Sequence, residues 1–139
     1  MAAKEKRVVD PALTASRLEL LKLKYPNLYP EDFKFGCGEG WYEIIDELSV
    51  ILSKEFKMMI QNGEEPFIDR MDEHNGRLRI IASDSNASID FAIKSANSKS
   101  TKFCEMCGQQ AKISSVNGWA RTLCRRHRVM LEDMTKRRS

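Results

Sequence analysis

The stretch Cys104-Glu-Met-Cys107, followed after sixteen intervening residues by Cys124-Arg-Arg-His127, decides how the C-terminal part of this chain folds. In each pair, two residues separate the side chains that can bind metal, and Asn117-Gly118 between the pairs favours a tight hairpin turn. This spacing brings both pairs together at the ends of a short hairpin, where four ligands can surround one ion tetrahedrally. The sequence therefore predicts a zinc ribbon with Cys104, Cys107, Cys124 and His127 as its ligands.

The predicted zinc is expected to be structural. Four protein ligands close the coordination sphere, whereas a catalytic zinc usually keeps one position open for water. A module as small as residues 101–139 buries little apolar surface, so metal binding is expected to supply its folding energy. Beyond Cys124, a basic helix is expected to run towards Met134, followed by a fraying end.

Composition and charge favour an intracellular protein with a basic tail. The chain is 42% hydrophobic and 31% charged, as is typical of globular proteins. Its charged start and the lack of a long apolar run predict no signal peptide and no membrane span, hence a cytoplasmic location with reduced thiols. Residues 1–100 carry 14 Lys/Arg and 17 Asp/Glu, whereas residues 101–139 carry 9 and 3. This asymmetry indicates contact of the tail with nucleic acid or an acidic partner.

Residues 1–100 are expected to form an α+β domain in which helices pack on a small antiparallel hairpin. Apolar residues recur at three- and four-residue steps after Trp41, which predicts a core helix over residues 41–61. A helix is also expected over residues 11–24, where Asp10-Pro11 provides a start, and another over residues 86–97.

The hairpin of this domain is expected over residues 67–82. Asn75-Gly76 lies between two strand-like runs and suits a tight two-residue turn, which places Leu78 and Ile80 on one face. Asp84 or Ser85 is expected to cap the helix that follows. The polar segment 97–101 is expected to link this domain to the zinc module.

The basic residues of the module form the best candidate for a binding surface. Guanidinium and ammonium groups neutralise phosphates, and an exposed indole can stack on a base. For Trp119, a role as a core residue that covers the zinc hairpin is favoured over stacking, whereas buried arginines would each need a buried partner. The candidate nucleic-acid or partner-binding residues are Lys112, Trp119, Arg121, Arg125, Arg126 and Arg128.

Three features that could indicate an enzyme or a nucleotide site are weak. The glycine-rich stretch 36–40 precedes a helix as a phosphate loop does, but no Lys-Ser or Lys-Thr pair follows it. A tight turn that brings Trp41 into the core is favoured instead. Cys37 is expected to be an inert, buried or semi-buried thiol, since only His74 lies outside the metal motif as a base. A zinc-supported nuclease would need a further histidine within the module. We therefore predict no enzymatic activity.

Several motifs together resemble a family of small proteins encoded by bacteriophages and prophages, most of them without an assigned activity. The resemblance covers about residues 33–130 and is carried by Gly-Cys-Gly-Glu-Gly-Trp-Tyr-Glu-Ile-Ile-Asp-Glu-Leu (36–48), Gly-Arg-Leu-Arg-Ile (76–80), Cys-Glu-Met-Cys-Gly (104–108) and Gly-Trp-Ala-Arg-Thr-Leu-Cys-Arg-Arg-His (118–127). It implies a phage accessory protein in a bacterial cytoplasm, but no mechanism.

Two functions remain open at this point. The first is a zinc-binding accessory protein that binds nucleic acid or nucleoprotein at a nucleic-acid-processing machine. The second is a protein-directed inhibitor of a host defence or nucleic-acid-processing enzyme, with no nucleic-acid binding of its own. The basic module suits both, because an inhibitor can occupy the groove that an enzyme keeps for nucleic acid. The sequence does not decide the oligomeric state.

Overall fold

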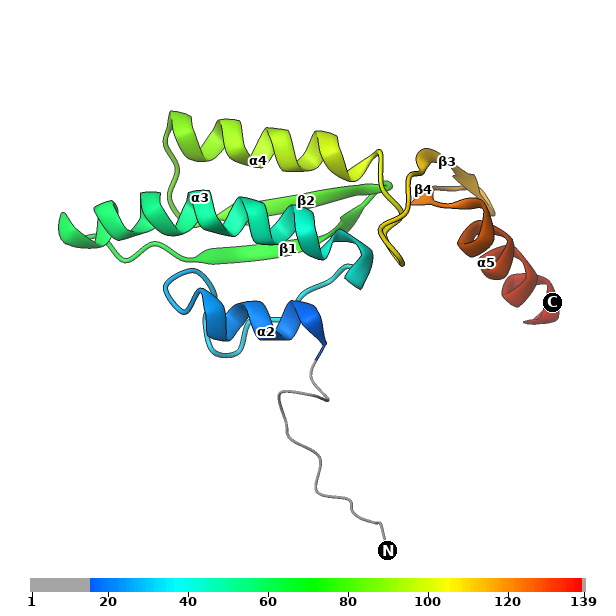
Figure 1. The fold of residues 1–139 in the computed structure, drawn as a ribbon, viewed down its shortest axis with the longest axis horizontal. Helices are drawn as coiled ribbons and strands as arrows, with labels where there is room; N and C mark the ends of the chain where they lie inside the picture. Colours follow the sequence, from blue (N-terminus) through cyan, green and yellow to red (C-terminus); the bar gives the residue numbers. More distant parts are fainter. Residues whose placement is uncertain (1–15, 139) are drawn as a thin grey trace, which may run out of the picture.

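The computed structural model describes residues 16–138, and its fold is α+β, as the sequence predicts. Four α-helices and two small antiparallel hairpins make up this part of the chain (Figure 1). The second hairpin lies beside the cysteine cluster. None of the helices within residues 16–138 combines the length and the apolar composition needed to cross a membrane.

The main layer consists of two helices packed on the first hairpin. Helix α3 (Tyr42–Gln61) follows the short 3-10 helix η1 (Glu39–Trp41), and helix α4 (Ala87–Ser100) runs along both α3 and the hairpin (Figure 1). The buried residues of α3 recur at the predicted helical spacing, so that one face of the helix enters the core. They are Ile44, Ile45, Leu48, Ser49, Leu52 and Phe56.

The first hairpin has the predicted turn and the predicted faces. Strand β1 (Ile68–His74) pairs with β2 (Arg77–Ala82), and Asn75 and Gly76 have φ angles of 53° and 82°. A tight turn of this kind requires positive φ at both central residues, which Asn and Gly tolerate best. Leu78 and Ile80 are buried, which confirms that they share the core face of the hairpin.

Helix α2 (Arg17–Lys24) is shorter than the helix predicted over residues 11–24. Ser16 is extended and its side chain accepts a hydrogen bond from the backbone of Glu19, so Ser16 is the N-cap. The predicted start at Asp10-Pro11 lies outside the described residues.

Helix α4 differs from its prediction at both ends. Asn86, and not Asp84 or Ser85, caps it through a hydrogen bond from the backbone of Ile89. The helix then continues to Ser100, through most of the segment predicted to be a linker. The reason is tertiary: Asn97 donates to the carbonyl of Leu78, and Ser100 accepts from the amide of Leu78, so both side chains fasten the helix to β2.

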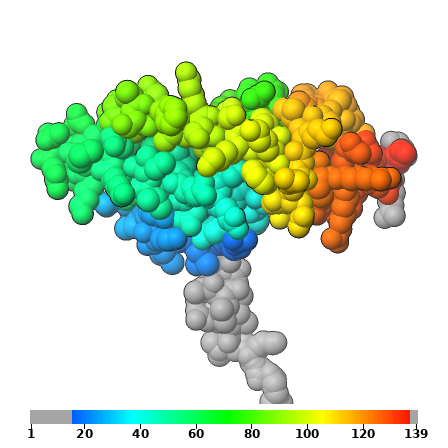
Figure 2. All heavy atoms as spheres, turned by 45° about the horizontal axis from the view of Figure 1, so that its top comes forward, coloured from blue at the N-terminus to red at the C-terminus, as the bar shows by residue number. Residues whose placement is uncertain are grey.

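The C-terminal hairpin and the last helix extend from one end of the main layer. Strands β3 (Lys112–Val116) and β4 (Trp119–Leu123) flank the predicted Asn117-Gly118 turn, and α5 (Arg125–Arg138) continues beyond the predicted end at Met134. This module adjoins the turn of the first hairpin (Figures 1 and 2). At this contact the Thr122 hydroxyl donates to the carbonyl of Gly76 at 2.7 Å, a buried hydrogen bond between the two hairpins.

Candidate metal centre and the basic groove beside it

The four predicted ligands come together in one cluster. Cys104 and Cys107 lie in the turn before β3, Cys124 directly precedes α5, and His127 lies in the first turn of that helix. One ligand atom from each residue lies within 4.8 Å of all the others, so this Cys3His group could hold one metal ion. Cys104 is fully buried, whereas Cys107 is exposed.

The distances between the ligand atoms fit tetrahedral coordination. Metal–sulfur bonds of about 2.3 Å and metal–nitrogen bonds of about 2.0 Å at tetrahedral angles place two sulfurs about 3.8 Å apart and a sulfur and a nitrogen about 3.5 Å apart. The Sγ atoms of Cys107 and Cys124 are 3.8 Å apart. His127 Nδ1 lies 3.6 Å from the Sγ atom of Cys104 and 3.3 Å from that of Cys124. The imidazole would therefore bind through Nδ1.

Local backbone geometry prepares Cys104 to act as a thiolate. Burial by itself raises the pKa of this thiol, but backbone N–H groups of Cys124, Cys107 and Met106 hydrogen-bond to the sulfur, and the net effect is a lowered pKa. Gly108 closes the turn with a φ angle of +81° and donates its N–H to the Cys104 carbonyl at 2.8 Å. The turn thus favours the anionic form of Cys104, whereas burial and the neighbouring thiols of Cys104 and Cys124 raise the pKa of Cys107.

The glycine-rich stretch 36–40 is the surface on which this cysteine turn packs. A Cβ atom on Gly40 would lie 2.1 Å from the carbonyl oxygen of Cys104 and 2.6 Å from the amide nitrogen of Cys107. A Cβ atom on Gly38 would lie 2.5 Å from the carbonyl oxygen of Glu105. Only glycine permits so close an approach of two backbones. The Gly40 N–H also donates to the Glu105 carbonyl at 2.7 Å.

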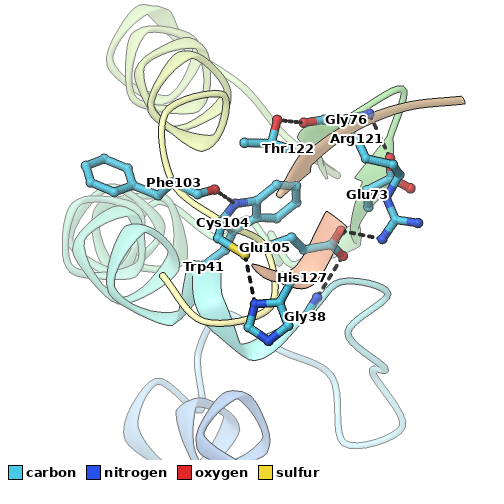
Figure 3. A network of polar contacts seen from close by, with 10 residues as sticks. All are labelled: Gly38, Trp41, Glu73, Gly76, Phe103, Cys104, Glu105, Arg121, Thr122 and His127. Atoms are coloured by element: carbon cyan, nitrogen blue, oxygen red, sulfur yellow. Dashed lines mark hydrogen bonds and ion pairs between the residues drawn. The ribbon is translucent and has the colours of Figure 1, made fainter. Parts of the chain in front are cut away.

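Glu105, between the first two cysteines, ties the metal-binding turn to both of its neighbours (Figure 3). One carboxylate oxygen accepts from the Gly38 N–H at 2.9 Å, and the other accepts from Arg121 on β4 at 3.0 Å. Its backbone N–H donates to the carbonyl of Thr122 at 2.9 Å. The N–H groups of Gly36, Gly38 and Gly40 are therefore bound to the chain itself, and the glycines are explained without a phosphate.

Trp41 forms a second connection. Its ring is fully buried in the main core, and its Nε1–H donates to the carbonyl of Phe103 at 2.9 Å, directly before Cys104 (Figure 3). The expectation that the tight turn brings Trp41 into the core is confirmed. The neighbouring Cys37 is half-buried against the same core, and burial raises the pKa of its thiol to about 12. Such a thiol is protonated at neutral pH and is a poor nucleophile.

The predicted binding residues divide into two groups. Lys112, Arg125 and Arg126 are exposed and Arg128 is half-exposed. Arg121 is different, because its guanidinium is paired with the buried carboxylate of Glu105. Sequence reasoning did not identify Glu105 as a partner, although it is the one acidic residue from Cys104 to His127. Arg121 is therefore a structural residue of the module.

Trp119 lies at the start of β4 with 73% of its surface exposed. The prediction that this indole covers the zinc hairpin as a core residue is wrong. The small apolar cluster beside the metal ligands is formed instead by Cys104, Val116 and Leu123, with Leu131 of α5 packed against it.

A groove of about 700 Å³ lies between β3 and the start of α5. Four cationic side chains line it: the predicted Lys112, Arg125 and Arg128, and also Lys102, which sequence reasoning missed. No carboxylate is among the described residues that line the groove. None of the four cations forms an ion pair with another residue in the described range. The sequence did offer one indication that Lys102 belongs to this surface, since it lies two residues before the ligand Cys104.

Comparisons of the chain with models of protein families, with curated proteins and with solved structures found no match. The fold and the site therefore define the class of protein by themselves. It is an α+β protein with a C-terminal Cys3His group that could hold one metal ion, beside a cationic groove.

Proposed function

We propose that this protein is a zinc-binding accessory protein without enzymatic activity, which binds nucleic acid or nucleoprotein at a nucleic-acid-processing machine. The observation that carries the proposal is the groove lined by Lys102, Lys112, Arg125 and Arg128 without a carboxylate. Cations that line one concave surface, and that form no ion pair within the described part of the chain, provide a site for the phosphates of a polyanion.

Zinc is the metal that the donor set suits best. Three thiolates and one imidazole, arranged tetrahedrally, are the ligands and the geometry that zinc prefers. When bound, the ion cross-links the cysteine turn to the start of α5 and completes a closed, structural site. The ligands position Arg125 and Arg128 beside Lys102 and Lys112, so the metal organises the groove and takes no part in chemistry.

The motifs that resemble those of small phage and prophage proteins provide a setting for this role. They support an accessory protein made in a bacterial cytoplasm, where thiols stay reduced and can hold zinc. The resemblance supplies no substrate and no activity. The choice of nucleic acid as the partner therefore rests on the charge of the groove.

The test is a titration of fluorescently labelled oligonucleotides followed by anisotropy at several salt concentrations. Four or five phosphate contacts predict a log–log slope of Kd against salt of about 3 to 5 in magnitude, because each contact releases a counterion. Charge reversal at the exposed Lys112 and Arg125 is expected to abolish binding at about 150 mM salt. The matched control reverses Lys54 and Lys57, which are exposed near the far end of α3 (Figure 1).

A protein-directed modulator is the second candidate, and one observation favours it. Phe91 on α4 is 76% exposed and lines a small pocket between α3 and α4, together with Leu48 and Ile51. An exposed aromatic residue over an apolar pocket is typical of protein-binding surfaces. Absence of any nucleic-acid complex at 150 mM salt and micromolar protein, with nuclease-resistant capture of a host protein that Phe91→Asp prevents, would replace the first function by the second.

A further inference from the structure

We infer that the groove takes single-stranded nucleic acid in preference to duplex. This inference rests on the proposed function and names the substrate class of the same site. It follows from the shape of the groove, from the position of its apolar side chains and from the exposed indole of Trp119.

The cations of the module line a concave surface. Proteins that read duplex insert a convex element, a helix or a two-stranded ribbon, into a groove of the double helix. In this module, the start of α5 and the strand β3 form the walls of a groove, so Lys102, Lys112 and Arg128 face a hollow. A flexible single strand can enter such a hollow, whereas a duplex can touch only its rim.

The interior of the groove suits bases and sugars as well as phosphates. Leu123 is buried, and Ala111 and Ile113 are half-buried, whereas Lys102 and Lys112 are exposed. The groove is therefore lined by apolar as well as cationic residues. Bases are accessible to apolar side chains only when they are not paired and stacked inside a duplex.

Trp119 lies on β4, outside the residues that line the groove. It lies four residues from Leu123 on β4, so both side chains point to the same face of the strand, about 13 Å apart along it. A strand of a few nucleotides spans that distance. At 73% exposure, the indole offers a free face on which a base can stack.

The experiment compares a labelled, mixed-sequence single strand of about 15 nucleotides with the duplex of the same sequence, at about 150 mM salt. The inference predicts at least a ten-fold lower Kd for the single strand. Trp119→Ala is expected to raise that Kd five-fold or more, which corresponds to about 1 kcal/mol or more for one stacked base, and to leave the duplex Kd within two-fold. Phe91→Ala is the matched control, because Phe91 is equally exposed on α4.

A direct reading of stacking comes from tryptophan fluorescence. Trp119 and Trp41 are the two tryptophans of the chain, and Trp41 is fully buried, so quenching on addition of single strand reports on Trp119. The Trp119→Phe variant should lose the quenching and keep much of the affinity.

Two results would overturn the inference, and they are distinguishable. If duplex binds as tightly as single strand and Trp119→Ala changes neither, the groove binds phosphates alone, and the proposed function stands. If neither nucleic acid binds while zinc content and circular dichroism are those of the folded protein, the proposed function falls together with the inference.

Discussion

Arg121 on β4 donates a hydrogen bond of 3.0 Å to Glu105, whose side chain is only 7% exposed. The other oxygen of this carboxylate accepts from the Gly38 N–H. One buried acidic residue thus joins the cysteine turn to the C-terminal hairpin on one side and to the glycine-rich stretch on the other.

Breaking this ion pair is expected to destabilise the module. Arg121→Met leaves a buried carboxylate without its cation, which typically costs about 3–5 kcal/mol. The control is Arg79→Met, because the Asp72–Arg79 pair is part-exposed and is expected to cost about 1 kcal/mol or less. Urea unfolding measures both. Equal, small losses would mean that Glu105 does not organise the module.

The glycine-rich stretch yields a steric prediction. A methyl group on Gly40 would meet the backbone of Cys104 at 2.1 Å, and backbone cannot move aside as a flexible side chain can. Gly40→Ala is therefore expected to cost about 3 kcal/mol or more in unfolding free energy. Gly63→Ala is the control, since Gly63 has a φ of +89° but no atom within 4 Å of an added Cβ, which predicts a loss of about 1 kcal/mol. A fully stable Gly40→Ala protein would show that the two backbones are not in contact.

Measurement of the metal content distinguishes the four proposed ligands from Cys37, the cysteine outside the cluster. Protein purified without added metal is expected to hold one zinc per chain, measured by elemental analysis and native mass spectrometry. Cys107→Ser should lose it, because a hydroxyl is a poor replacement for a thiolate. Cys37→Ser should keep all of it, since Cys37 packs against the main core and the cluster is complete without it. Halved metal content in Cys37→Ser would refute the ligand assignment.

Helix α3 is expected to be the main source of stability in the larger layer. Leu48 and Ile45 are 3% and 0% exposed, and truncation of either to alanine typically costs about 2–4 kcal/mol. Val50 on the same helix is 43% exposed, so Val50→Ala should cost under about 1 kcal/mol. Denaturant unfolding of the three variants measures these losses in unfolding free energy. Losses well under 1 kcal/mol at Leu48 and Ile45 would place the helix on the surface.

The parts of the fold that the sequence predicts are the ones encoded locally. Asn117-Gly118 has φ angles of 54° and 86°, as a tight turn needs, and this dipeptide is enough to place β3 and β4 on either side. The spacing of the four ligands likewise predicts the metal cluster, because each pair lies within a single turn of the chain.

The parts that were missed depend on contacts between distant segments. Segment 97–101 is polar and looks like a linker, but its side chains bind the backbone of Leu78, and no local pattern reveals this. Arg121 looks like a surface cation until Glu105 is placed beside it. The glycine-rich stretch predicts a tight turn, yet the turn of Cys104, more than sixty residues later, is what requires glycine there.

The measurement that tests the central claim most directly is a single-strand binding titration at about 150 mM salt, before chelation, after chelation and after return of zinc. If zinc organises the cationic groove, micromolar or tighter binding is lost on chelation, with loss of structure in the C-terminal module, and both return with one equivalent of zinc. Undiminished binding by the metal-free protein, or no binding by the zinc-loaded protein, would contradict the account.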